Sequence, residues 1–168
     1  MKTDWKDLCN TAKQQLHATS HLVPHSGMSF ITLLHEPSFD NHSFLKVTWK
    51  SDVFTWHRSI WDRVADSVKF TPIGNLPYIG KEIIPTIVQT AGSGDIQSMQ
   101  AIINTIANLS IRPRINPLNR FTLDGSHYTL TIGVDDLHTT YYWHTSPDEW
   151  QDLEDLADQL LRFQEGLR

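Results

Sequence analysis

The side chains best suited to acid–base chemistry in this 168-residue chain are its 9 histidines and its 19 Asp and Glu residues. Three of them, His57, Asp62 and Asp66, fall within one short segment. A histidine beside carboxylates can act as a general base, so these residues form the basis of a hydrolase or nuclease hypothesis with a site in a cleft. No other catalytic residue is assigned, because the sequence carries no catalytic signature.

Metal and nucleotide chemistry have less support in the sequence. His17, His21 and His25 recur at a spacing of four, but Pro24 interrupts the helical turn before His25. Neither G-x-S-x-G nor H-E-x-x-H occurs. The stretch 92–95, Gly-Ser-Gly-Asp, precedes a predicted helix but lacks the Lys-Ser/Thr of a P-loop, so we interpret it as a loop with a helix N-cap. We therefore expect neither a metal nor a cofactor.

Negative charge is concentrated at the C-terminal end of the chain. Residues 121–168 contain ten acidic and two basic side chains, a formal net charge of −8, whereas residues 1–120 carry +3. Such a surface repels nucleic acid and attracts basic proteins, so we expect a basic protein partner. The alternative is that these acids only make the helix soluble. The acids assigned to docking lie on the outer arc of the predicted last helix: Asp148, Asp152, Asp155 and Asp158.

Two tryptophans form a second candidate contact surface. Trp56 and Trp61 are flanked by charged side chains, and Trp and Arg dominate binding hot spots. The segment that contains them, 52–69, is apolar on almost every side of a predicted helix, which also suits burial between two layers. The sequence leaves open whether these tryptophans contact a partner or belong to the core.

The last quarter of the chain has the clearest structural pattern. Asp-Gly at 124–125 lies between two alternating runs, which is a strong hairpin signal. The S-x-x-E sequence that starts at Ser146, with Pro147 at the first helical position, is a capping box. The predicted elements are strands 120–123, 126–134 and 137–144 and a helix from Ser146 to Gly166, with Trp150 in the core.

The earlier part of the chain also alternates between helix and strand patterns. The predicted elements are a helix from Thr3 or Asp4 to about His21, strands 28–34 and 43–50, a helix over 52–69, an extended piece at 83–89 and a helix over 95–109. The fold class is α+β. An antiparallel sheet, formed by the N-terminal hairpin and the C-terminal three-stranded meander, packs against the N-terminal, middle and C-terminal helices.

The composition is that of a single α+β domain over residues 1–168, in which a Pro/Gly-rich connection, 71–90, joins subregions 1–70 and 90–168. No apolar run approaches the roughly 20 residues that span a bilayer, so we expect no membrane partner. The lone Cys9 excludes an intrachain disulfide and favours a cytoplasmic location. We interpret Cys9 as a small core residue, not as a nucleophile.

About a third of the chain resembles a known kind of protein. The residues that carry the resemblance are Leu123-Asp124-Gly125, Tyr128-Thr129-Leu130, Tyr142-Trp143, Pro147, Trp150-Gln151-Asp152-Leu153 and Leu160-Leu161. They look like the terminal strand–strand–helix unit of small bacterial proteins, some of which are similar to immunity proteins of polymorphic toxin systems. The resemblance implies a single-domain α+β protein that acts by binding, without a cofactor or catalytic residue.

Three functional hypotheses follow from the sequence. The leading one is a non-enzymatic protein-binding protein, an immunity-type inhibitor that masks a basic toxin or effector through the acidic C-terminal helix. The second is the hydrolase or nuclease that uses His57, Asp62 and Asp66. The third is a structural or assembly subunit that buries Trp56 and Trp61 against another copy.

Overall fold

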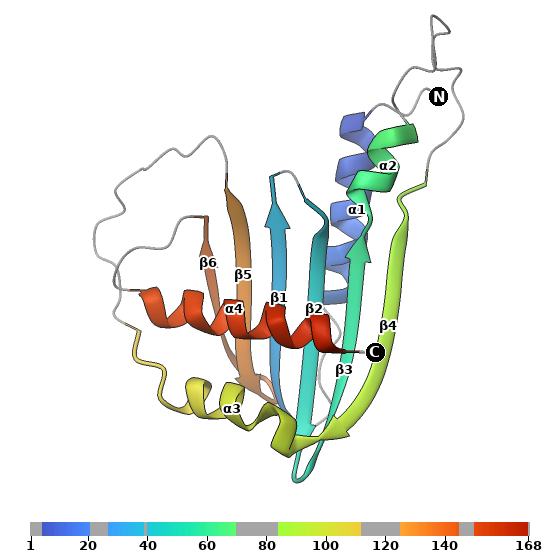
Figure 1. Ribbon diagram of the computed structural model, residues 1–168. Coiled ribbons are helices and arrows are strands. Elements are labelled where there is room, and N and C mark those ends of the chain that lie inside the picture. Colours follow the sequence, from blue (N-terminus) through green and yellow to red (C-terminus); the bar gives the residue numbers. More distant parts are fainter. Residues whose placement is uncertain are drawn as a thin grey trace, which may run out of the picture.

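The computed structural model describes residues 5–20, 27–38, 40–69, 84–111, 125–144 and 150–167. Its centre is one antiparallel sheet of six strands in the order β4-β3-β2-β1-β5-β6 (Figure 1). The strands are β1 (Ser29–Pro37), β2 (His42–Lys50), β3 (Val53–Trp61), β4 (Ile87–Asp95), β5 (Ser126–Val134) and β6 (Leu137–Trp143). Both predicted subregions therefore contribute strands to the same sheet.

Helices lie on both faces of this sheet (Figure 1). On one face, α4 (Gln151–Gly166) crosses the strands, and α3 (Gln100–Ala107) lies beside it after the short 3₁₀ helix η1 (Ile96–Met99). On the other face, α1 (Trp5–Ser20) packs against β1, β2 and β3. The short helix α2 (Arg63–Lys69) follows β3 directly.

The alternation of side chains along β1 and β2 assigns each apolar residue to one of these two layers. Leu33 and Leu45 pair across the strands and point toward α4. Leu34 and Phe44 are the next pair along and point toward α1, where they pack with Trp61. Because both faces of these central strands are buried, their sequences are apolar at consecutive positions.

The apolar stripe of α4 is the main cover of its face of the sheet. Four of its side chains are at most 1% exposed: Leu153, Leu156, Ala157 and Leu160. At one end of the helix Trp150 makes an edge contact with Tyr141 of β6. At the other end Phe163 packs on Phe54 of β3, with ring centroids 5.6 Å apart. The helix therefore spans the sheet from β6 to β3.

Two glycines of β4 make room for aromatic rings of β3. A Cβ atom on Gly92 would lie 2.9 Å from Cζ2 of Trp56, and one on Gly94 would lie 2.6 Å from Cε1 of Phe54. Contacts this short essentially never occur between real side chains, so a side chain at either position would force the aromatic ring to shift. The rings of Trp56 and Phe54 consequently lie close to the backbone of the edge strand.

Much of the predicted architecture is confirmed. The α+β class, the antiparallel sheet, the hairpin of β1 and β2 and the hairpin of β5 and β6 are all present. The turn predicted between β5 and β6 contains Asp135 in the left-handed region, at φ 53°. The predicted helices at the two ends correspond to α1 and α4, and the helix predicted over 95–109 corresponds to η1 and α3.

Two predictions are wrong. Residues 53–61, expected to be helical, form β3, because both faces of this strand are covered and its period of two is hidden by apolar residues on each side. Residues 92–95, expected to form a loop, are the end of β4. Asp95 nevertheless caps the helix that follows, since its side chain accepts a hydrogen bond from the Gln97 N–H at 2.8 Å.

Two further predictions concern residues outside the described part of the chain. The predicted strand at 120–123 lies there. Of the predicted three-stranded meander, the structure therefore describes only the hairpin of β5 and β6. The capping box at Ser146, Pro147 and Glu149 lies there as well.

We expect Leu160→Ala to destabilise the fold by about 2–5 kcal/mol, because it leaves a cavity between α4 and the sheet. The free energy of unfolding is measured by urea denaturation. Arg162→Ala, an exposed position on the same helix, is the control and should change it by less than about 0.5 kcal/mol. A loss below about 1 kcal/mol for Leu160→Ala would mean that the contact between α4 and the sheet is not a well-packed core.

Candidate functional site: the acidic face of α4

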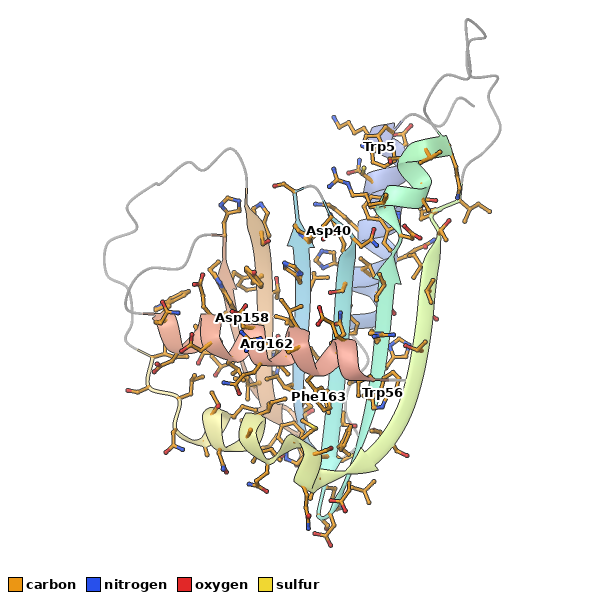
Figure 2. All side chains as sticks on the ribbon, viewed as in Figure 1. Trp5, Asp40, Trp56, Asp158, Arg162 and Phe163 are labelled. Atoms are coloured by element: carbon orange, nitrogen blue, oxygen red, sulfur yellow. The ribbon has the colours of Figure 1, made fainter. Side chains whose placement is uncertain are left out.

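Three of the four acids predicted for docking lie on the exposed side of α4, and Figure 2 labels one of them, Asp158, on this helix. Asp152, Asp155 and Asp158 are exposed, because the apolar stripe of the same helix is buried. Asp148 lies outside the described residues. We refer to Asp152, Asp155 and Asp158 as the acidic face.

The acidic face has little compensation from the protein itself. Within residues 150–167 and the other described ranges, no Lys, Arg or His side chain forms an ion pair with Asp152, Asp155 or Asp158. Asp155 accepts one hydrogen bond, from Gln151 Nε2 at 2.9 Å. The carboxylates therefore remain available to a cationic partner.

A polar groove runs along one flank of the acidic face, between α3 and α4. Its volume is about 400 Å³. It is lined by amide, hydroxyl and carboxylate groups and one leucine: Asn104, Thr105, Asn108, Leu109, Asp152, Asp155 and Gln159. Thr105 Oγ1 donates to Gln159 Oε1 at 3.1 Å and joins the two helices across the groove. Such a lining can accept hydrogen bonds from the guanidinium or ammonium group of a partner.

A row of stacked rings lies on the face of the sheet that α4 covers. His35 stacks on Tyr128 with centroids 4.8 Å apart, and Tyr128 stacks on Trp143 at 5.0 Å. Burial raises the pKa of the Tyr128 phenol, and the nearby charges of Asp158 and Glu154 raise it further. Nothing in the spacing of the sequence predicted this row, because its members come from β1, β5 and β6.

The arrangement suits recognition of basic side chains. Carboxylates pair with guanidinium and ammonium groups. The exposed carboxylates lack the enclosed, low-dielectric surroundings that general acid catalysis requires.

The two tryptophans assigned to partner binding lie in the core. Trp56 is 6% exposed and Trp61 is 0% exposed. They also point to opposite faces of β3, Trp56 toward α4 and Trp61 toward α1. They do not form a joint contact surface, and the core alternative is the one that the structure supports.

The three residues of the hydrolase or nuclease hypothesis are not brought together. His57 lies within β3, about 16 Å along the strand from Asp62. Asp62 caps α2, where its side chain accepts a hydrogen bond from the Ala65 N–H at 2.9 Å. Asp66 is fully buried. Within the described residues no hydrogen bond or ion pair links His57 with either acid, and each of the three has a separate structural environment.

Asp66 is the centre of a buried polar network. Its carboxylate accepts hydrogen bonds from Trp61 Nε1, the Thr86 N–H and Thr86 Oγ1 at 2.7–2.8 Å and pairs with the Lys69 ammonium. Burial alone would raise the pKa of this carboxyl group, but the four donors together lower it below its ordinary value. All acceptor sites are used within the fold, so Asp66 fixes α2 against β3.

A second cluster of ionisable groups lies between α1 and the sheet. Glu36 of β1 forms an ion pair with Lys13 of α1 at 3.1 Å. His42 lies 3.7 Å from the same carboxylate and packs its ring edge-on against Trp61. Burial, reinforced by the charges of Lys13 and Arg63 and opposed by Glu36, lowers the pKa of His42 from 6.5 to about 4. His42 is therefore neutral in the folded protein near pH 7.

The comparisons with known proteins add no family to this description. Protein-family models, curated proteins and solved structures all give no match. Among the described residues, no group of three or more His, Cys, Asp or Glu side chains is placed to hold a metal ion. None of the helices in the described ranges is long and apolar enough to cross a membrane.

The burial of neutral His42 makes the stability of the protein sensitive to acid. The imidazole of His42 binds a proton near pH 6.5 in the unfolded chain but only near pH 4 in the folded protein. The contribution of neutral His42 to the free energy of unfolding is therefore fully present above pH 6.5 and is lost as the pH falls toward 4. We expect a loss of about 3 kcal/mol from this group. His35, His57 and His127, whose pKa values burial also lowers, act in the same direction.

The measurement is the free energy of unfolding by urea at several pH values between 7.5 and about 4. His42→Phe keeps a ring against Trp61 and removes the titration, so this variant should show a shallower decline. Equal pH dependence in the variant and the natural protein would show that His42 does not remain neutral in the fold.

Proposed function

We propose that this chain is a non-enzymatic protein-binding protein that masks a basic partner with the acidic face of α4, in the manner of an immunity-type inhibitor of a basic toxin or effector. The observation that carries the proposal is the exposure of Asp152, Asp155 and Asp158 without an ion pair among the described residues. Carboxylates arranged in this way stabilise a complex only when a cationic surface faces them.

The surroundings of the acidic face support the same proposal. The groove between α3 and α4 has room for the end of a long basic side chain and presents acceptor groups to it. This lining extends the contact beyond charge alone, to hydrogen bonding.

The rigid attachment of α4 also favours binding. Arg58 of β3 donates a hydrogen bond from Nη1 to the Gln164 carbonyl oxygen at 2.6 Å, near the C-terminal end of the helix. A cation at this end of a helix satisfies unpaired carbonyl groups and opposes the helix dipole. The helix is thus held in place before any partner arrives, which lowers the entropic cost of association.

The proposal is tested by charge reversal. Asp152→Lys/Asp155→Lys should weaken the complex with the partner about tenfold or more, because two attractive contacts become repulsive. The partner is obtained by capture on the immobilised full-length chain from its native cells and identified by mass spectrometry. Its affinity for each variant is then measured by calorimetry at about 50 and 300 mM salt.

A matched control is available at the far end of the sheet. Asp52→Lys/Asp136→Lys makes the same change in net charge at two exposed positions near the β2–β3 and β5–β6 turns, and should leave the affinity within about twofold. Equal losses for both pairs would assign the effect to net charge. Unchanged affinity and salt dependence for the α4 pair would refute docking through the acidic face.

A further inference from the structure

Among the described residues, the outer edge of β4 is a row of main-chain groups without a strand partner. Strand β4 is at the end of the sheet order and pairs only with β3 among the described strands. Its nine residues are IVQTAGSGD, without proline and without a charged side chain before Asp95. Natural proteins usually protect such an edge with charges, prolines or bulges, and the register of β4 with β3 is continuous, without a bulge.

The hydrogen bonds at the two ends of the β3–β4 ladder determine which residues face outward. Asp62 N–H donates to the Thr86 oxygen and Ile96 N–H donates to the Asp52 oxygen, both at 2.9 Å. In an antiparallel ladder, hydrogen-bonded pairs alternate with pairs that are not hydrogen-bonded. Carried through the register, this alternation directs the main-chain groups of Val88, Thr90, Gly92 and Gly94 toward β3. Those of Ile87, Gln89, Ala91 and Ser93 point away from the sheet.

The outward row is complementary to a second copy of itself. If two β4 strands pair antiparallel about a twofold axis at Ala91, Gln89 faces Ser93 of the other copy and Ile87 faces Asp95. No like charges face each other in this register, because Asp95 is the one charged residue of β4 and it faces Ile87. On the α4 side of the sheet, each larger side chain faces a glycine: Val88 faces Gly94 and Thr90 faces Gly92.

This register also gives the exposed Val88 a place to pack. Val88 is 52% exposed in the single chain. In the pair it would lie against Gly94 of the other copy, over which the Phe54 ring extends. Contacts between β-branched and aromatic side chains across strands stabilise a sheet.

We propose that β4 is a homodimerisation edge, at which two copies of this chain pair antiparallel about Ala91 and join their sheets into one. The interface is isologous, as in most soluble homodimers. Because α4 crosses the sheet from β6 to β3, the acidic face stays outside the strand pairing. The proposal does not depend on the proposed function.

Sedimentation velocity of the full chain over a concentration series to about 0.5 mM tests the proposal. We expect the natural chain to form dimers, and Ala91→Glu to weaken self-association about tenfold or more, because two carboxylates then face each other. Thr139→Glu adds the same charge at an exposed position on β6, the opposite edge strand, and should have little effect. Salt should not weaken the natural dimer, since this edge is neutral, whereas it should weaken a complex at the acidic face.

Mixing variants tests the register itself. Ala91→Glu and Ala91→Lys should each be mainly monomeric, and an equimolar mixture should restore dimers because opposite charges then meet at the axis. Ala91→Cys should form a disulfide-linked dimer under mild oxidation, since paired Cα atoms at about 5.5 Å suit a disulfide. Ser93→Cys should not form this disulfide, because in this register Ser93 does not face Ser93 of the other copy. The natural chain is the control for disulfides formed by Cys9.

A monomeric natural chain throughout the concentration series would overturn the proposal. Dimers lost in Thr139→Glu but kept in Ala91→Glu would place the interface on β6 and overturn it as well. Cross-linking by Ser93→Cys and not by Ala91→Cys would exclude pairing about Ala91. Circular dichroism and urea denaturation of each variant confirm that the strand itself is intact.

Discussion

The burial of one apolar stripe of α4 on the sheet is the contact on which the rest of this structure depends. The stripe fixes which side of the helix faces solvent, and the acids have no alternative to that side. Charge and packing are therefore two results of one helical period. A sheet face that must be covered, and a helix with only one side able to cover it, place the carboxylates where a partner can reach them.

The two faces of the sheet are covered by different kinds of side chain. Toward α4 the strands supply large apolar groups and a row of stacked rings, and the polar chemistry is on the helices. Toward α1 the cover includes an ion pair and a neutral histidine, so this layer responds to acid. Within the described chain, the exposed carboxylates of α4 and the Glu36–Lys13 ion pair are thus on opposite sides of one sheet.

The sequence was most informative where one face of an element meets water. The alternation in Ser126–Val134 and the stripe of α4 predicted both elements, because solvent leaves a readable period. In β3 both faces are covered, so Phe54, Trp56 and Trp61 obscure the period and suggested a helix. The acids could be predicted from the helix alone. The ring row and the groove could not, since they require strands and helices that are distant in sequence to be neighbours.

The glycines of β4 link the rim of the sheet to the helix above it. Phe54 covers Gly94 and also supports Phe163 of α4. A side chain at either glycine would push the aromatic rings of β3 away from β4 and would tilt the end of α4. A substitution in this edge strand would therefore also change the exposed surface of α4. Gln89, Ala91 and Ser93 project to the other face of this strand, so the rim can vary at these positions without disturbing the rings under the helix.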